Sequence, residues 1–216
     1  MARDNHPRAR QAAALARKKS ARPPYDRVLI VCEGSKTEPH YFDEIRQAYR
    51  IPTAHITVLP SALGTEPRQV VDSAQQEFLK SREYERIYAV FDRDDHLTWV
   101  DALAQSQRLD RAMRNDEKRE VRFQAVPSVP CFELWLLLHF EDVHAFGHRT
   151  EIIARLRDRI AGYEKGARGI YALTEPRFDD AADRAQRLRG RFEPVVGTDP
   201  FTSADELVAV LKSIKQ

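Results

Sequence analysis

Apolar residues occur along the chain with two different periods. Short runs that are continuously apolar and rich in β-branched residues predict buried strands at residues 28–32, 56–59, 87–91 and 121–126. Between these runs, apolar positions recur at helical spacing, as at Tyr41, Phe42 and Ile45, which predicts helices. Strands that alternate with helical stretches indicate βαβ units, so we expect an α/β fold with a parallel sheet of about four strands, flanked by helices.

Polar residues mark where several of these helices begin. Ser35 and Glu38 form a capping-box pattern at the start of the first helix, and Ser203 and Glu206 repeat it before the last one. A longer helix is expected at residues 97–115. The capping pattern therefore places Glu38 in the first turn of that helix.

The pattern changes after the fourth strand. Residues 131–140 follow a turn bracketed by Pro127 and Pro130 and are apolar on nearly every side, which predicts a buried helix. Farther along the chain only helical patterns occur, at residues 150–161, 177–190 and 203–214. We therefore expect an α/β domain over residues 25–146 and a helical extension over residues 147–216 that packs on it.

Composition restricts the class of protein. The 216 residues are 42% hydrophobic and 31% charged, which suits one globular domain with an appendage and argues against a membrane protein. No apolar stretch resembles a membrane span or a signal peptide, so we expect a soluble, cytoplasmic protein without a membrane partner. The two cysteines, Cys32 and Cys131, lie far apart in apolar runs, which excludes a disulfide scaffold and a cysteine-rich zinc site.

Charge is distributed unevenly along the chain. Residues 1–24 contain seven basic residues and one acidic residue, whereas the rest of the chain has more acidic than basic residues. Such a basic arm suggests contact with a polyanion, because arms of this kind release counterions when they meet phosphates. A disordered tail that only aids solubility is an equal alternative.

Two of the predicted strands end in acidic residues. Glu33 follows the first strand, and Asp92 and Asp94 follow the third. The carboxyl ends of parallel strands meet at one edge of a sheet, where ligands of open α/β folds bind. Carboxylates that converge there repel one another unless a cation lies between them, and oxygen ligands suit Mg²⁺ or Mn²⁺. The alternative for residues 92–95 is a solvated turn that caps the next helix.

Glu133 is a further acidic candidate. It falls in the first turn of the helix that Pro130 opens, where a carboxylate either caps the helix or acts as a third ligand of a metal or water. His139 lies six residues later and about 120° around the helix, so it does not share a face with Glu133. We interpret His139 as a structural residue.

Several basic residues could contact phosphate groups. Lys36 and Arg93 flank the acidic residues, and Lys165 follows Tyr163 in a polar segment. A further basic series lies at Arg184, Arg187, Arg189 and Arg191. For each of these residues the alternative is a solvated charge, and a helix of alternating charge more often forms a solvated face.

Four segments resemble the motifs of the RloB-like family. They are VCEGSKTEPHYF at residues 31–42, FDRD with His96 at residues 91–96, PCFELWLLLHF at residues 130–140, and DPFTS followed by DELV at residues 199–208. This family is placed among Toprim-like proteins, whose site is a Glu after one strand and a DxD after a later strand. The resemblance implies that Glu33, Asp92 and Asp94 form such a site. Asp199 stands where the family is expected to have Asn.

The resemblance implies a Mg²⁺-dependent or Mn²⁺-dependent nuclease in anti-phage defence, with an RloA-like ATPase partner. Two other hypotheses remain open: a non-catalytic subunit that binds nucleic acid or a signal and regulates an ATPase, and a haloacid-dehalogenase-like phosphatase. The acid-ended strand before the DxD favours the Toprim site over the phosphatase. Whether the substrate is DNA, tRNA or another RNA stays open, and a homo-oligomer is compatible with the sequence.

Overall fold

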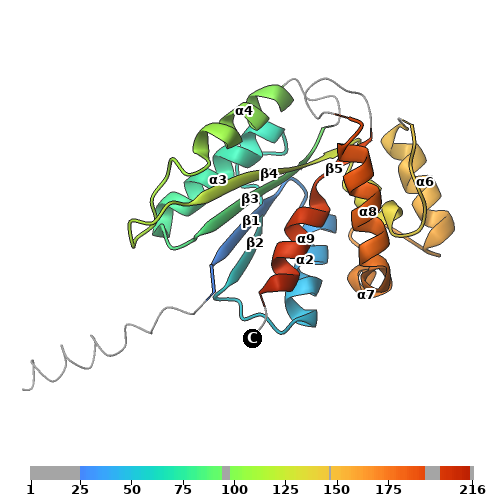
Figure 1. Ribbon diagram of the computed structural model, residues 1–216, viewed down its shortest axis with the longest axis horizontal. Coiled ribbons are helices and arrows are strands. Elements are labelled where there is room, and N and C mark those ends of the chain that lie inside the picture. The colour runs from blue at the N-terminus through green and yellow to red at the C-terminus, as the bar shows by residue number, and fades with distance from the viewer. Residues whose placement is uncertain (1–24, 94–97, 146, 193–199, 215–216) are drawn as a thin grey trace, which may run out of the picture.

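The computed structural model describes residues 25–93, 98–145, 147–192 and 200–214. The predicted arm, residues 1–24, lies outside these ranges. Five strands form one sheet in the order β2-β1-β3-β4-β5 (Figure 1). Their bounds are Val28–Cys32 for β1, Ile56–Pro60 for β2, Arg86–Asp92 for β3, Arg122–Val129 for β4 and Phe201–Thr202 for β5. The first four strands are parallel and β5 is antiparallel to β4, which confirms the expected α/β fold.

Helices cover both faces of the sheet, which explains why the central strands are continuously apolar. On one face lie α3 and α4, and on the other lie α2 and α9 (Figure 1). These helices span Thr37–Ala48 (α2), Pro67–Ser81 (α3), Trp99–Leu109 (α4) and Ala204–Ser213 (α9). All five residues of β1 are buried: Leu29 and Val31 pack toward α3, and Ile30 packs toward α2.

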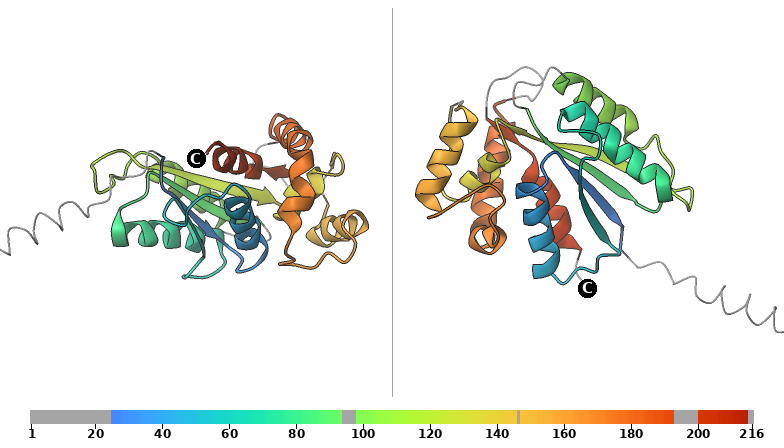
Figure 2. Two further views of the ribbon diagram at one scale, coloured as in Figure 1. Left: turned by 90° about the horizontal axis from the view of Figure 1, so that it is seen from below. Right: turned by 180° about the vertical axis from the view of Figure 1, so that it is seen from behind.

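A further group of helices lies beyond the carboxyl ends of the strands (Figures 1 and 2). It comprises α5 (Glu133–Leu138), α6 (Arg149–Arg159), α7 (Ile170–Thr174), a 3-10 turn (Glu175–Arg177) and α8 (Phe178–Arg189). The predicted helix of residues 131–140 is buried as expected, although its regular part is only six residues long.

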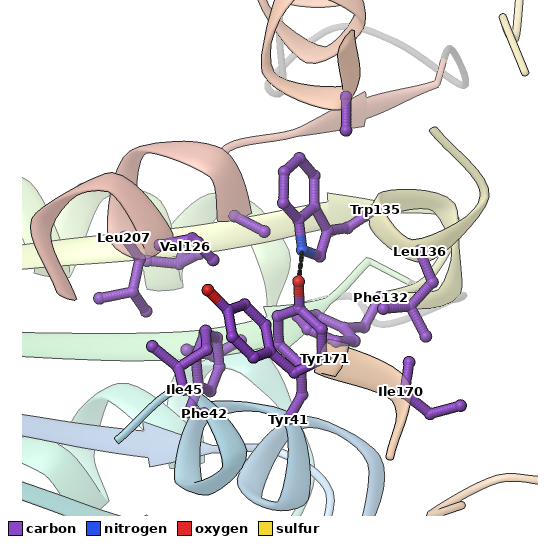
Figure 3. Packing of buried hydrophobic residues seen from close by; sticks show 14 of the residues in the cluster. Tyr41, Phe42, Ile45, Val126, Phe132, Trp135, Leu136, Ile170, Tyr171 and Leu207 are labelled. Carbon is purple, nitrogen blue, oxygen red and sulfur yellow. Dashed lines mark hydrogen bonds between the residues drawn. The ribbon is translucent and has the colours of Figure 1, made fainter. Parts of the chain in front are cut away.

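One hydrophobic cluster joins this group of helices to the sheet. In Figure 3 the indole of Trp135 on α5 donates a hydrogen bond to the hydroxyl of Tyr41 on α2, with 3.1 Å between Nε1 and the oxygen. The ring of Tyr171 on α7 packs edge-on against Tyr41 at 5.6 Å between centroids. Leu207 of α9 and Ile152 of α6 belong to the same cluster. The sequence predicts a domain boundary after residue 146. Residues from both sides of this predicted boundary therefore share one core.

Helix ends are where the sequence predictions were wrong. Helix α2 begins after Lys36, and no side chain caps it, so Ser35 and Glu38 form no capping box. Ser203 is the N-cap of α9, but its side chain makes no capping hydrogen bond. A capping box does occur at α3, between Glu66 and Gln69. Capping depends on the backbone angles of the N-cap residue, which the residue type alone does not determine.

Two further elements differ from the expectations. The helix expected at residues 97–115 ends at Leu109, because the Asp110 carboxylate turns to accept a hydrogen bond from the Phe123 N–H at 2.9 Å. Strand β5 was not predicted, since two residues are too few to show a period. In the part of the chain that the structure describes, no helix combines the length and apolarity needed to cross a bilayer.

Candidate active site

A pocket of about 200 Å³ opens at the carboxyl ends of β1 and β3. The chain leaves β1 through α2 to β2 on one side, whereas β3 lies on the other side of β1. Such a switch point between neighbouring parallel strands is where open α/β sheets bind ligands. The residues that line the pocket are Glu33, Gly34, Ser35, Lys36, Thr37, Glu38, Asp92, Glu133, Arg149 and Lys165.

Glu33 and Asp92 are held together by the pairing of β1 with β3. The backbone N–H of Glu33 donates to the Val90 carbonyl at 2.8 Å, which extends the ladder one residue beyond β1. The Glu33 carboxylate in turn accepts the backbone N–H of Asp92, with 2.7 Å between Oε2 and N. Glu33 is therefore bound to the end of β3. Asp94 lies outside the described residues.

Glu38 forms part of the same pocket from the first turn of α2. Its side chain is buried, with 6% of its surface exposed. Burial, together with the negative charges of Glu133 and Glu33, raises the pKa of its carboxyl group to about 7, against the opposing charge of Lys165. The loop after β1 passes close to it, because a Cβ placed on Gly34 would lie 2.6 Å from Glu38 Oε2.

Glu133 is buried at the start of α5 and meets groups from the segment between α6 and α7. Its Oε1 accepts a hydrogen bond from the Tyr163 hydroxyl at 3.5 Å and lies 3.7 Å from the Lys165 ammonium. Glu133 is 2% exposed and the Lys165 side chain is 49% exposed, so the pair connects the pocket floor with its rim. Glu133 stands in the first turn of α5, next to the N-cap residue Phe132.

The segment that carries Lys165 is fixed to the start of α2. Gly166 donates its N–H to Thr37 Oγ1 at 3.1 Å, and its carbonyl accepts from His40 Nδ1 at 2.8 Å. Gly166 has a φ of +81°, and a Cβ there would lie 2.7 Å from the Lys36 Cβ. Both the angle and the close approach require glycine. Lys36 and Lys165 are thereby placed on the same pocket.

Other basic candidates do not line the pocket. The Arg93 guanidinium carbon lies 5.9 Å from the centre of the Trp99 ring on the opposite face of the sheet. The series on α8 makes bonds within the protein: Arg184 donates to the Leu138 carbonyl at 2.7 Å. Arg187 donates to Asp142, and Arg189 to Asp205, at 2.8 and 2.7 Å. Three of the four arginines are thus engaged within the protein, and whether the series contacts nucleic acid or forms a solvated face stays a prediction.

The pocket offers carboxylate oxygens, which are the donors that Mg²⁺ and Mn²⁺ prefer. Within the described residues, no group of three or more Asp, Glu, His or Cys side chains is arranged to hold a metal ion. Glu33 and Asp92 do lie together, and Mg²⁺ is commonly held by one or two carboxylates with water and substrate phosphate. The pKa of Glu38 is raised chiefly by burial, and the negative charges of Glu133 and Glu33, which a cation would offset, add to this effect. The donor set fits such an ion.

Sequence reasoning missed two charged residues of the pocket. Glu38 was assigned to a capping box, although it stands only five residues after Glu33, within the first motif. Arg149 comes from the first residue of α6, and no local pattern marks it. His139, by contrast, is buried and bonded through Nδ1 to the Trp135 carbonyl at 2.9 Å, as expected for a structural residue.

Comparison with known proteins gives one match. The family model described as RloB-like protein matches residues 28–211 and so covers most of the chain. No curated protein and no solved structure matches the chain significantly.

Proposed function

This chain belongs to the RloB-like family, and we propose that it is a metal-dependent nuclease that hydrolyses phosphodiester bonds in nucleic acid. One observation carries the proposal: Glu33 and Asp92 adjoin at the switch point of a parallel sheet, in a pocket that also contains basic residues. Acidic residues suit a catalytic cation, and basic residues suit the phosphates of a substrate. A purely structural pair of acids would not need a pocket around it.

The proposal gives each pocket residue a task. Glu33 and Asp92 would hold the ion, together with Asp94, which lies outside the described residues. A bound Mg²⁺ would polarise the phosphate and lower the pKa of the attacking water. Lys36, Arg149 and Lys165 would bind phosphate oxygens at the rim. Glu38 would take part in proton transfer, with burial raising the pKa of its carboxyl group and the bound cation lowering it.

The wider role is proposed from the family alone. The resemblance described above connects RloB-like proteins with anti-phage defence in the bacterial cytoplasm and with an RloA-like ATPase partner. On this view the nuclease acts with, or under the control of, that partner. The nucleic-acid class of the substrate is left to experiment.

The test is a cleavage assay with the full chain, with and without the ATPase partner. Labelled single-stranded and double-stranded DNA, tRNA and other RNA are incubated with Mg²⁺ or Mn²⁺. Glu33→Gln removes the charge but keeps an oxygen that accepts the Asp92 N–H. We expect this variant to fold normally and to cut roughly a hundredfold more slowly, because a neutral amide holds the catalytic cation less well than a carboxylate does.

Asp101→Asn is the matched control, because Asp101 is an exposed acid on α4 that does not line the pocket. It should cut at the wild-type rate. A folded Glu33→Gln protein that also cuts at that rate would remove Glu33 from the mechanism. If no substrate is cut in any condition but nucleic acid binds, the chain is the non-catalytic subunit considered above.

A further inference from the structure

The pocket that contains Glu33 and Asp92, which we call the acidic pocket, is small. Its volume is about 200 Å³, whereas pockets that enclose a drug-sized ligand are commonly about 300–1,000 Å³. A nucleoside is a ligand of that size. The acidic pocket therefore has room for a phosphodiester group with its ion and water, but not for a whole nucleotide.

The lining of the acidic pocket offers nothing for a base to stack on. Proteins that hold a base in a site usually place flat aromatic or apolar side chains against its faces. The lining residues that the structure describes are charged residues, hydroxyl-bearing residues and one glycine. The hydroxyl of Tyr163 reaches Glu133, but this tyrosine is 2% exposed and its ring belongs to the hydrophobic core. A base that entered the pocket would lose its contacts with water and gain no stacking partner.

Most groups that could read the edge of a base are already engaged. Asn and Gln, the side chains that pair with adenine, do not occur among the described lining residues. The Thr37 hydroxyl accepts the Gly166 N–H at 3.1 Å, and the Glu33 carboxylate accepts the Asp92 N–H at 2.7 Å. The carboxylate of Glu133 has a tyrosine hydroxyl and a lysine ammonium group as neighbours. These bonds hold the walls of the pocket together before any ligand arrives.

The rim of the pocket, by contrast, carries lysine side chains that reach into solvent. Lys36 is exposed, and the Lys165 side chain is 49% exposed. An ammonium group is a compact charge on a flexible stem, so it binds a phosphate oxygen of any nucleotide equally well. Contacts to phosphate and sugar position a strand but carry no sequence information.

We propose that the acidic pocket binds a nucleic-acid strand through its sugar–phosphate backbone and reads no base at the bond to be cut. This inference rests on the proposed function, because it takes the ligand to be nucleic acid. The bases on either side of the bond lie outside the pocket. Any preference for a sequence or a folded shape of nucleic acid then arises on another surface of the chain or on a partner.

The test compares an intact strand with a strand of the same length in which every nucleotide is a stable abasic analogue. Binding to the full chain is measured by fluorescence anisotropy, with Ca²⁺ as the divalent ion to slow hydrolysis. We expect Lys165→Gln to weaken binding of both strands by the same factor, roughly fivefold, the scale of one exposed ion pair. The matched control is Lys80→Gln, because Lys80 is an exposed lysine on α3 that does not line the pocket. It should change neither affinity.

Cleavage with Mg²⁺ gives a second measurement, in which one abasic nucleotide is moved along a labelled strand. The rate at a bond beside it should stay within about threefold of the rate beside a base, whereas loss of a stacked base would lower that rate roughly tenfold or more.

The outcomes separate this inference from the proposed function. Equal weakening of both strands by Lys165→Gln without any cleavage supports the inference and refutes the nuclease. The inference is overturned if Lys165→Gln weakens the intact strand more than the abasic one, or if it weakens neither. It is also overturned if cleavage requires one particular base, such as a guanine bound by Arg149.

Discussion

Glu38 shows how the surroundings of one residue change its chemistry. The side chain stands in the first turn of a helix, where a carboxylate is ordinarily stabilised. Here it is buried near Glu33 and Glu133, and its carboxyl pKa is raised to about 7. A carboxyl group whose pKa is higher in the folded than in the unfolded chain makes folding less favourable as the pH rises. The stability that accompanies protonated Glu38 is fully present below about pH 4.5 and is lost as the pH rises through about 7.

Glu38→Gln should therefore stabilise the protein in a pH-dependent way. At pH 8, without divalent ions, we expect the variant to melt roughly 5 °C above the wild type, because it removes a buried charge. At pH 5 the two proteins should melt within about a degree of each other. Calorimetry at both pH values measures the difference, and Asp101→Asn should show no such dependence. The same gain at pH 5 and pH 8 would contradict the prediction.

The acidic pair of the site could be predicted, but its surroundings could not. Glu33 and Asp92 each end a strand, and parallel strand ends necessarily meet at one edge of the sheet. The sequence identified Glu133 and Lys165 as candidate site residues, but it could not predict that they contact each other. Their contact depends on how the segment around Gly166 docks on α2.

At the scale of elements, the hydrophobic periods predicted the four parallel strands and the positions of the main helices. Short elements were missed, because two residues of β5 and five of α7 show no period. The hydrogen bond between Tyr41 and Trp135 could not be predicted from the sequence either, because it joins α2 to α5 inside the core. It fixes the helix that carries Glu133 against the helix that carries Glu38.

Tyr41→Phe should weaken this junction. The phenylalanine keeps the ring packing but leaves the buried indole N–H of Trp135 without its acceptor, which costs about 1–3 kcal/mol. We expect the free energy of unfolding in urea to fall by that amount, with little change in the slope of unfolding against denaturant.

Tyr49→Phe provides the comparison, since its half-buried hydroxyl lies at the end of the same helix. Loss of the Tyr49 hydroxyl should lower the free energy of unfolding less than loss of the Tyr41 hydroxyl does, because the Tyr49 hydroxyl is partly solvated. If the two variants are equally stable, the junction does not depend on the hydroxyl of Tyr41.

At the scale of the whole molecule, charge is separated along the chain. The arm, residues 1–24, is strongly basic, whereas the remaining chain is slightly acidic and has an acidic pocket. A polyanion is therefore expected to meet the arm first and the pocket second. The arm contains no group that the proposed chemistry uses.

Deleting residues 1–24 should reduce the salt dependence of nucleic-acid binding while leaving the saturating cleavage rate nearly intact. Each phosphate contact that is lost lowers the slope of log K against log salt concentration by about 0.9 for duplex DNA. Binding measured across a series of salt concentrations tests this. A full-length variant with the seven basic residues of the arm changed to Gln should behave like the deletion. An unchanged slope would assign the arm to solubility alone.

Residues on both sides of the predicted domain boundary at position 146 share one core. This arrangement has a consequence for the synthesis of the protein. Glu33, Glu38 and Asp92 leave the ribosome before Lys165, and Leu207 of the same core follows later still. Chains grow at about 5–20 residues per second, so the acidic residues exist for several seconds without the segment that completes their pocket. The nuclease proposed above would therefore gain its complete site only after the segment around Lys165 has emerged and packed on α2.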